Sequence, residues 1–108
     1  MRAPVLIGPG ALIFLPGRMF YMESRVAVIG IIVEDPAQAE PLNHILHEYG
    51  SHIIGRMGIP YPKRGVNVIS VAVDAPQDII SALAGKVGRL PGVSAKAAYS
   101  NVVSREED

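Results

Sequence analysis

Three histidines, His44, His47 and His52, lie close together in the sequence. Neutral imidazoles are good ligands for nickel and zinc, and residues three apart on a helix share one side of it. The same positions lie off the apolar stripe of the helix expected here, so a solvated polar face is the simpler explanation. Because a closed site needs three or four converging ligands, we predict no metal and no cofactor, and keep a nickel-type sensor using these histidines as the alternative.

The segment 55–65 combines positive charge, a tyrosine and several glycine and proline residues. We expect it to connect two strands and to be the main contact loop. Arg56 and Arg64 could each pair with a carboxylate or phosphate through two hydrogen bonds, and Tyr61 could stack or donate its hydroxyl. The other interpretation is a stiff hairpin whose charges keep a sheet edge soluble.

The segment 85–89 superficially resembles a phosphate-binding loop, and Lys86 and Arg89 are therefore candidate ligand contacts. It lacks the Walker spacing, and we expect it at the end of a helix, where the dipole favours cations. Favourable charge at a helix C-terminus is the simpler explanation of both side chains.

Little in the sequence indicates catalysis. There is no cysteine, no G-x-S-x-G motif, and no serine, histidine and acid that spacing links. Acylphosphatase-like hydrolysis would share the fold predicted below, but the expected turn Glu34-Asp35-Pro36 is acidic and would repel a phosphate. We therefore predict that the protein is not an enzyme, with a small hydrolase or oxygenase of the same fold as a less favoured alternative.

The overall charge narrows the class of partner. Ten Lys and Arg balance ten Asp and Glu among 108 residues, so the chain lacks the basic excess that duplex binding demands. We expect no direct binding of nucleic acid by this chain alone. The absence of cysteine excludes disulfides, thiol nucleophiles and iron–sulfur ligation, and fits a reducing cytoplasm.

Residues 1–22 form an apolar N-terminal extension. Gly8-Pro9-Gly10 and Pro16-Gly17 interrupt it, so it is too short and broken to span a bilayer. No small-residue cleavage site supports a signal peptide. We interpret the extension as a mis-called start, with the native start at Met22, or as an arm that packs on a neighbour; residues 23–108 are the domain.

The domain contains the same unit twice, which predicts its architecture. β-Branched runs at 26–33 and 66–73 are each followed by a helix-capping pattern, at Asp35 and at Asp74. Apolar stripes at helical spacing come next: Leu42, Ile45, Leu46 and Tyr49 in the first unit, and Ile80, Leu83, Val87 and Leu90 in the second. The predicted order is strand 25–33, helix 36–49, strand 52–58, strand 65–73, helix 76–89 and strand 94–103. This α+β pattern is a ferredoxin-like βαββαβ sandwich, with two helices on one face of a four-stranded antiparallel sheet.

Both faces of the two central strands are apolar, although the helices can cover only one. We expect the covered face to comprise Ala27, Ile29, Ile31, Val33, Ile69, Val71 and Val73, and the other to carry Val26, Val28, Ile32, Val66, Val68 and Ala72. An uncovered antiparallel face is normally polar, so we predict that this one packs on another subunit in a dimer or tetramer. Gly30 and Ser70 fall at equivalent points of that face, where small residues permit close sheet packing or approach of a ligand.

Several motifs in order resemble the putative iron-only hydrogenase system regulator family. They are 28–35 (VIGIIVED), 48–50 (EYG), 55–61 (GRMGIPY) and 85–93 (GKVGRLPGV), within a match of about 23–103. The resemblance implies an ACT-like fold, distantly similar to the ligand-binding domain of nickel-responsive repressors, and regulation rather than chemistry. No basic ribbon-helix-helix or helix-turn-helix segment accompanies it, so control of DNA would need a partner chain. We therefore expect a cytoplasmic homo-oligomer that binds a small-molecule effector or a hydrogenase-system protein.

Overall fold

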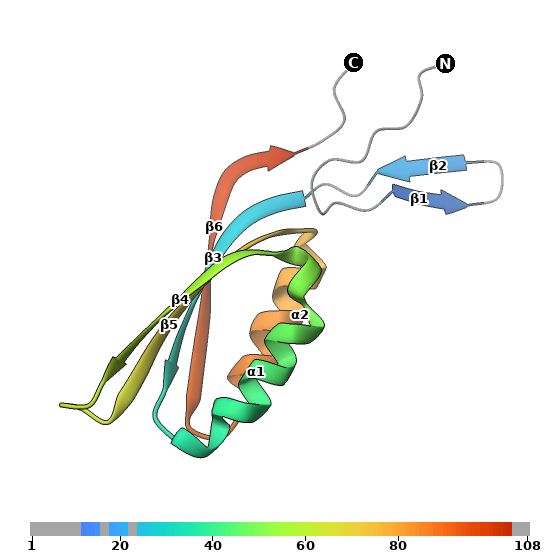
Figure 1. The fold of residues 1–108 in the computed structure, drawn as a ribbon. Helices are drawn as coiled ribbons and strands as arrows, with labels where there is room; N and C mark the ends of the chain where they lie inside the picture. The colour runs from blue at the N-terminus through green and yellow to red at the C-terminus, as the bar shows by residue number, and fades with distance from the viewer. Residues whose placement is uncertain (1–11, 16–17, 22–23, 105–108) are drawn as a thin grey trace.

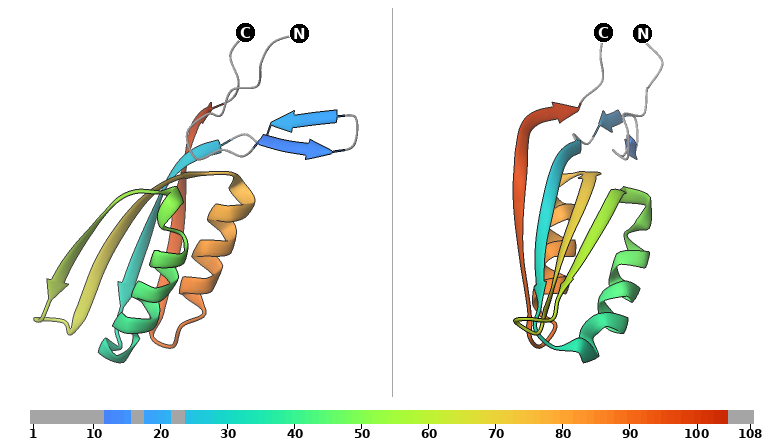
Figure 2. Two further views of the ribbon diagram at one scale, coloured as in Figure 1. Left: turned by 45° about the vertical axis from the view of Figure 1, so that its right-hand side comes forward. Right: turned by 60° about the vertical axis from the view of Figure 1, so that its left-hand side comes forward.

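Two helices cover one side of a four-stranded antiparallel sheet (Figures 1 and 2). The structure is a computed structural model that describes residues 12–15, 18–21 and 24–104, with side chains over 24–101. In chain order the elements are β1 (Leu12–Leu15), β2 (Arg18–Tyr21), β3 (Ser24–Val33), α1 (Ala39–Glu48), β4 (Ile53–Tyr61), β5 (Val66–Ala75), α2 (Gln77–Gly88) and β6 (Val93–Ser104), with 3-10 helices at Pro36–Gln38 and Gly50–His52. The sheet order β4-β5-β3-β6 confirms the predicted ferredoxin-like fold.

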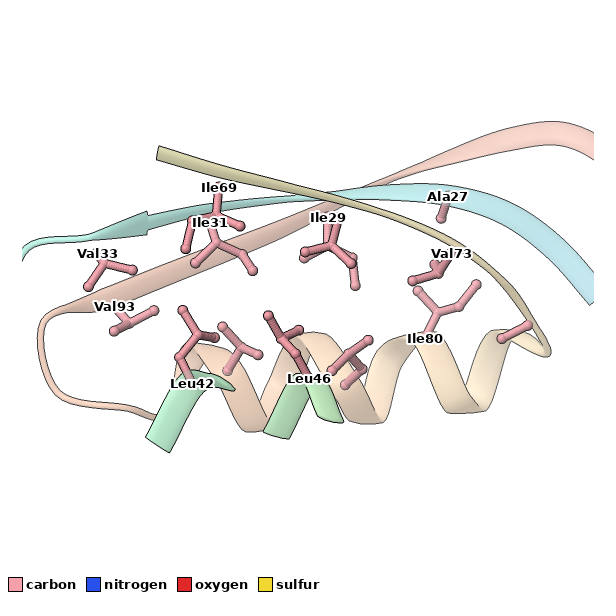
Figure 3. Packing of buried hydrophobic residues seen from close by; sticks show 14 residues of the cluster. Ala27, Ile29, Ile31, Val33, Leu42, Leu46, Ile69, Val73, Ile80 and Val93 are labelled. Atoms are coloured by element: carbon pink, nitrogen blue, oxygen red, sulfur yellow. The ribbon is translucent and has the colours of Figure 1, made fainter. Parts of the chain in front are cut away.

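The core lies between the sheet and the helices, and Figure 3 shows its side chains meeting there. Ile29 and Val71 oppose each other on β3 and β5 and are fully buried, and Leu83 of α2 is buried with them. The predicted covered face is confirmed, since all seven of its residues belong to this core. The helix stripes are confirmed too, because each of their residues is buried or packs partly buried against the core.

The first helix begins later than the sequence pattern suggests. Asp35 accepts a hydrogen bond from the Ala37 backbone N–H at 3.0 Å, as a capping residue should, but residues 36–38 form a 3-10 turn. Pro41 explains the delay, because it has no N–H to donate to the carbonyl of Ala37. The regular α-helical ladder can therefore start only after that missing bond.

The segment predicted as a contact loop is mostly strand. Residues 55–61 continue β4 and pair with β5 as far as Tyr61 opposite Val66, leaving only residues 62–65 as the turn. β4 is an edge strand, where glycine and proline are tolerated, so Gly58 and Pro60 do not end it.

β1 and β2 form a separate two-stranded hairpin, with Leu12 opposite Tyr21. The sequence pattern of this extension did not predict these strands. Residues 1–11, 16–17, 22–23 and 105–108 lie outside the described part of the chain, so the proposed start at Met22 remains a prediction. Among the described residues, no helix has the length and apolar character needed to cross a membrane.

Candidate functional site

The side of the sheet opposite the helices carries an exposed apolar surface, which we call the open face. By strand register it consists of alternate residues of all four strands. Seven of the nine exposed large hydrophobic side chains of the described residues lie on it: Val26, Val28, Ile32, Met57, Ile59, Tyr61 and Val68. Its charged residues among those described are Asp74 and Lys96, each on a different strand. The prediction of a second apolar face without helical cover is thus confirmed for β3 and β5, and β4 enlarges that face.

The centre of the open face is a trough beside a ridge. Gly30 and Ser70 oppose each other in the β3–β5 register, and because both residues are small we call this pair the trough. The next row along the strands contains Ile32 and Val68, whose branched side chains form the ridge. A hollow of about 260 Å³ lies over Gly30 and is lined by Ile32, Val68 and Lys96 among others. An alanine Cβ at Gly30 would come no closer than 3.9 Å to the Lys96 carbonyl oxygen, so Gly30 is open to an incoming group.

The predicted contact residues of 55–65 separate onto different surfaces. Tyr61 lies on the open face, while Arg56 pairs with buried Val71 and therefore lies on the helix side of β4. Arg64 is in the turn, where its backbone N–H donates to the Tyr61 carbonyl at 3.2 Å. These three side chains cannot form one binding loop, because a strand sends neighbouring positions to opposite faces.

Arg56 makes a side-chain hydrogen bond to the first helix. Its Nη2 donates to the Asn43 Oδ1 of α1 at 3.0 Å. Sequence reasoning missed Asn43 because its relation to Arg56 is purely tertiary. It also missed Met57 and Ile59 as open-face residues, although the alternation Met57, Ile59, Tyr61 was a usable strand signal.

Lys86 and Arg89 both pack on their own domain. The Lys86 Nζ lies 5.2 Å from the centroid of the Tyr49 ring, and so links α2 to the end of α1. Arg89 folds back along its helix, since its Nη1 would lie 3.5 Å from a Cβ placed on Gly85. Lys86 therefore has an intramolecular contact, and Arg89 lies against its own helix, in line with the explanation by helix-terminal charge.

Replacing Lys86 with methionine should lower the free energy of unfolding by about 0.5–1 kcal/mol, because the aliphatic stem is kept and the cation over the ring is lost. Urea unfolding would measure this change. Lys86→Arg should retain most of the stability, and Lys63→Met in the exposed turn serves as the control for simple loss of charge. Equal unfolding curves for Lys86→Met and Lys63→Met would show that the contact with Tyr49 contributes nothing.

The three histidines are not gathered into one site. His44 lines an open hollow with Glu40, while His47 lines a different hollow beside Arg56. His52 ends the 3-10 turn, and its Nδ1 is buried with no hydrogen-bond partner. Within the described part of the chain, no three His, Cys, Asp or Glu side chains are placed to hold a metal ion.

Comparisons with known proteins place the chain in a family. A family model described as "TM1266-like: Iron-only hydrogenase system regulator, putative" matches residues 25–97. A solved structure, uncharacterized protein TM1266 from Thermotoga maritima, is 31% identical with a TM-score of 0.67, and the match covers 70% of this chain and 96% of that one. Among curated proteins, none matches. The matched region spans both helices and most of the sheet, and on this evidence the chain belongs to the TM1266-like family of iron-only hydrogenase system regulators.

Proposed function

We propose that this chain is a regulatory binding module of the iron-only hydrogenase system that works in the cytoplasm as a homo-oligomer assembled through its open face. The observation that carries the proposal is the bare apolar side of the sheet. Family membership supports a regulatory role, and the balanced charge of the chain supports regulation through a partner instead of direct contact with DNA.

The exposure of the open face is the first argument for a covering surface. Val28 of the central strand β3 is 43% exposed, whereas its neighbours Ala27 and Ile29 on the helix side of that strand are buried. Met57 of the edge strand β4 is 61% exposed. An antiparallel sheet with one face in water normally carries polar residues there. Contiguous apolar surface of this kind is typical of interaction sites.

The size of the face suits a second copy of the chain. Four strands about 4.8 Å apart and five rows of same-face residues about 7 Å apart outline roughly 600 Å² per chain. Two copies would together bury about 1,200 Å², which reaches the lower end of specific protein interfaces. A small domain also gains stability from such association.

The relief of the face favours self-association. The ridge of Ile32 and Val68 lies one row away from the trough of Gly30 and Ser70. A two-fold axis between these rows would set the ridge of each copy into the trough of the other, as an isologous interface requires. The open face is therefore complementary to itself in shape as well as in apolar character.

Regulation would follow from the assembly, since an effector that binds one assembly state better shifts the population toward it. The direct test is a gene deletion in a cell that makes an iron-only hydrogenase. Deleting the gene for this chain should change the amount of hydrogenase transcript or mature enzyme, and the wild-type gene should restore it. A Val28→Lys gene should fail to restore it while producing the same amount of folded protein. Unchanged hydrogenase levels after deletion would contradict the regulatory role.

A further inference from the structure

A groove runs along the helix side of β4, from the space beside α1 to the space over β5, and we call it the α1–β4 groove. It consists of two adjoining hollows of about 310 and 250 Å³, and Arg56 lines both. Leu46 and Ile53 line the first hollow, and Ile69 lines the second. The groove therefore combines apolar walls with one cation at the point where the two hollows meet.

The path of the β4–β5 hairpin creates this groove. In Figure 1 the hairpin reaches away from both helices, and Figure 2 shows α1 covering only part of the sheet beside it. Gly50 lines the first hollow and Gly58 the second, so neither position contributes a side chain that would fill the space. A Cβ on Gly50 would have nothing within 4 Å.

Arg56 is held in place with most of its donors available. The bond to Asn43 Oδ1 uses Nη2, and a guanidinium has five N–H donors in a fixed fork. Neither hollow has an Asp or Glu among its lining residues, and His47 adds a second nitrogen-bearing side chain to the first hollow. The charge in the groove is thus positive and without an acidic counterpart in its lining, which complements an anion.

One arginine between apolar walls favours a carboxylate over a phosphate as the bound anion. A planar carboxylate matches the guanidinium fork with two parallel hydrogen bonds. A phosphate carries up to two charges and more acceptor atoms, and burying it beside Leu46 and Ile69 with one arginine would leave much of its charge uncompensated. An apolar tail, in contrast, would be released from water by the same walls.

We propose that the α1–β4 groove is a binding site for a small organic carboxylate with a short apolar tail, its carboxylate paired with Arg56. The site goes beyond the open-face assembly and does not depend on it, because Arg56 lies on the opposite side of the sheet from Val28. Asn43 acts as a positioning residue, holding one arm of the guanidinium so that the remaining donors face the groove.

The test is a titration of the full chain with hexanoate, followed by amide shifts in ¹H–¹⁵N NMR spectra. Residues of α1 and β4 around the groove should shift with a dissociation constant on the order of a few millimolar, as suits so small a probe. Hexanol and hexylammonium at the same concentrations should bind at least about fivefold more weakly, since neither can accept the pair of guanidinium bonds.

Arg56→Gln should weaken hexanoate binding at least about fivefold, while Arg64→Gln, the same change in the turn, should leave it unaltered. Melting curves of both variants would show that the fold is kept. Equal hexanoate affinity in Arg56→Gln and the wild type, or equal binding of hexanoate and hexanol, would overturn the site.

The Val28→Lys variant separates this site from the proposed assembly. It should bind hexanoate as the wild type does, and loss of binding in it would overturn the placement of the site on the helix side. A wild type that assembles but does not bind hexanoate would remove the carboxylate site alone, whereas a monomeric wild type that binds it would remove the assembly alone.

Discussion

Replacing Val28 with lysine should convert the assembled protein into a folded monomer. Val28 lies near the centre of the open face, between Ala72 of β5 and Ala98 of β6. In a two-fold pair the change introduces two ammonium groups into an apolar interface. Each ammonium group must either lose its hydration or extend to the solvent at the edge of the interface. We estimate a cost of about 3 kcal/mol per dimer, which weakens association about 100-fold.

Sedimentation or light scattering over a range of concentrations would measure this change. The isolated monomer should keep its melting temperature to within a few degrees, because the lysine would point into water there. Ala82→Lys is the matched control, since it adds the same charge at an exposed position of α2 on the other side of the molecule. A wild-type chain that stays monomeric at millimolar concentration would contradict the proposal, and so would equal assembly of the two lysine variants.

Replacing Gly92 with alanine should lower the free energy of unfolding by about 2–4 kcal/mol. Gly92 has φ +68°, a conformation that strains any residue with a Cβ. The added Cβ would also lie 2.9 Å from the Cβ of Asp35, and that contact cannot relax by moving a flexible side-chain end. Glu34 tightens the same junction, because its N–H donates to the Gly92 carbonyl at 2.7 Å. The connections β3–α1 and α2–β6 therefore meet at a point that only glycine fits.

Gly65→Ala separates the backbone contribution to this loss of stability from the contribution of the contact with Asp35. Gly65 has nearly the same φ, +67°, but nothing lies within 4 Å of its Cβ position. Its alanine variant should lose only about 1 kcal/mol, the backbone contribution. Urea unfolding of both variants would give the difference. If Gly92→Ala costs no more than Gly65→Ala, the contact with Asp35 is not tight.

Much of the fold could be predicted from local pattern, because its information lies in residue periodicity. The duplicated run of strand, cap and apolar helical stripe predicted both halves, and alternation along β3 and β5 predicted which residues face the helices. The second apolar face followed from the same alternation, since a strand cannot hide residues of opposite parity under one layer of helices. Element ends were less accurate where Pro41, Gly58 and Pro60 act differently in context from their average behaviour.

The candidate sites could be predicted less completely from the local sequence pattern than the fold. The sequence by itself determined that a βαββαβ sandwich would form and leave Val28, Ile32 and Val68 without helical cover, because side-chain direction in a strand depends only on position. Only the tertiary structure decided that Arg56 and Tyr61 lie on opposite faces, that Arg56 bonds to Asn43, and that Lys86 rests on Tyr49. These relations depend on how far β4 extends and how the helices pack across the sheet, and both are set by long-range contacts that no spacing along the chain encodes.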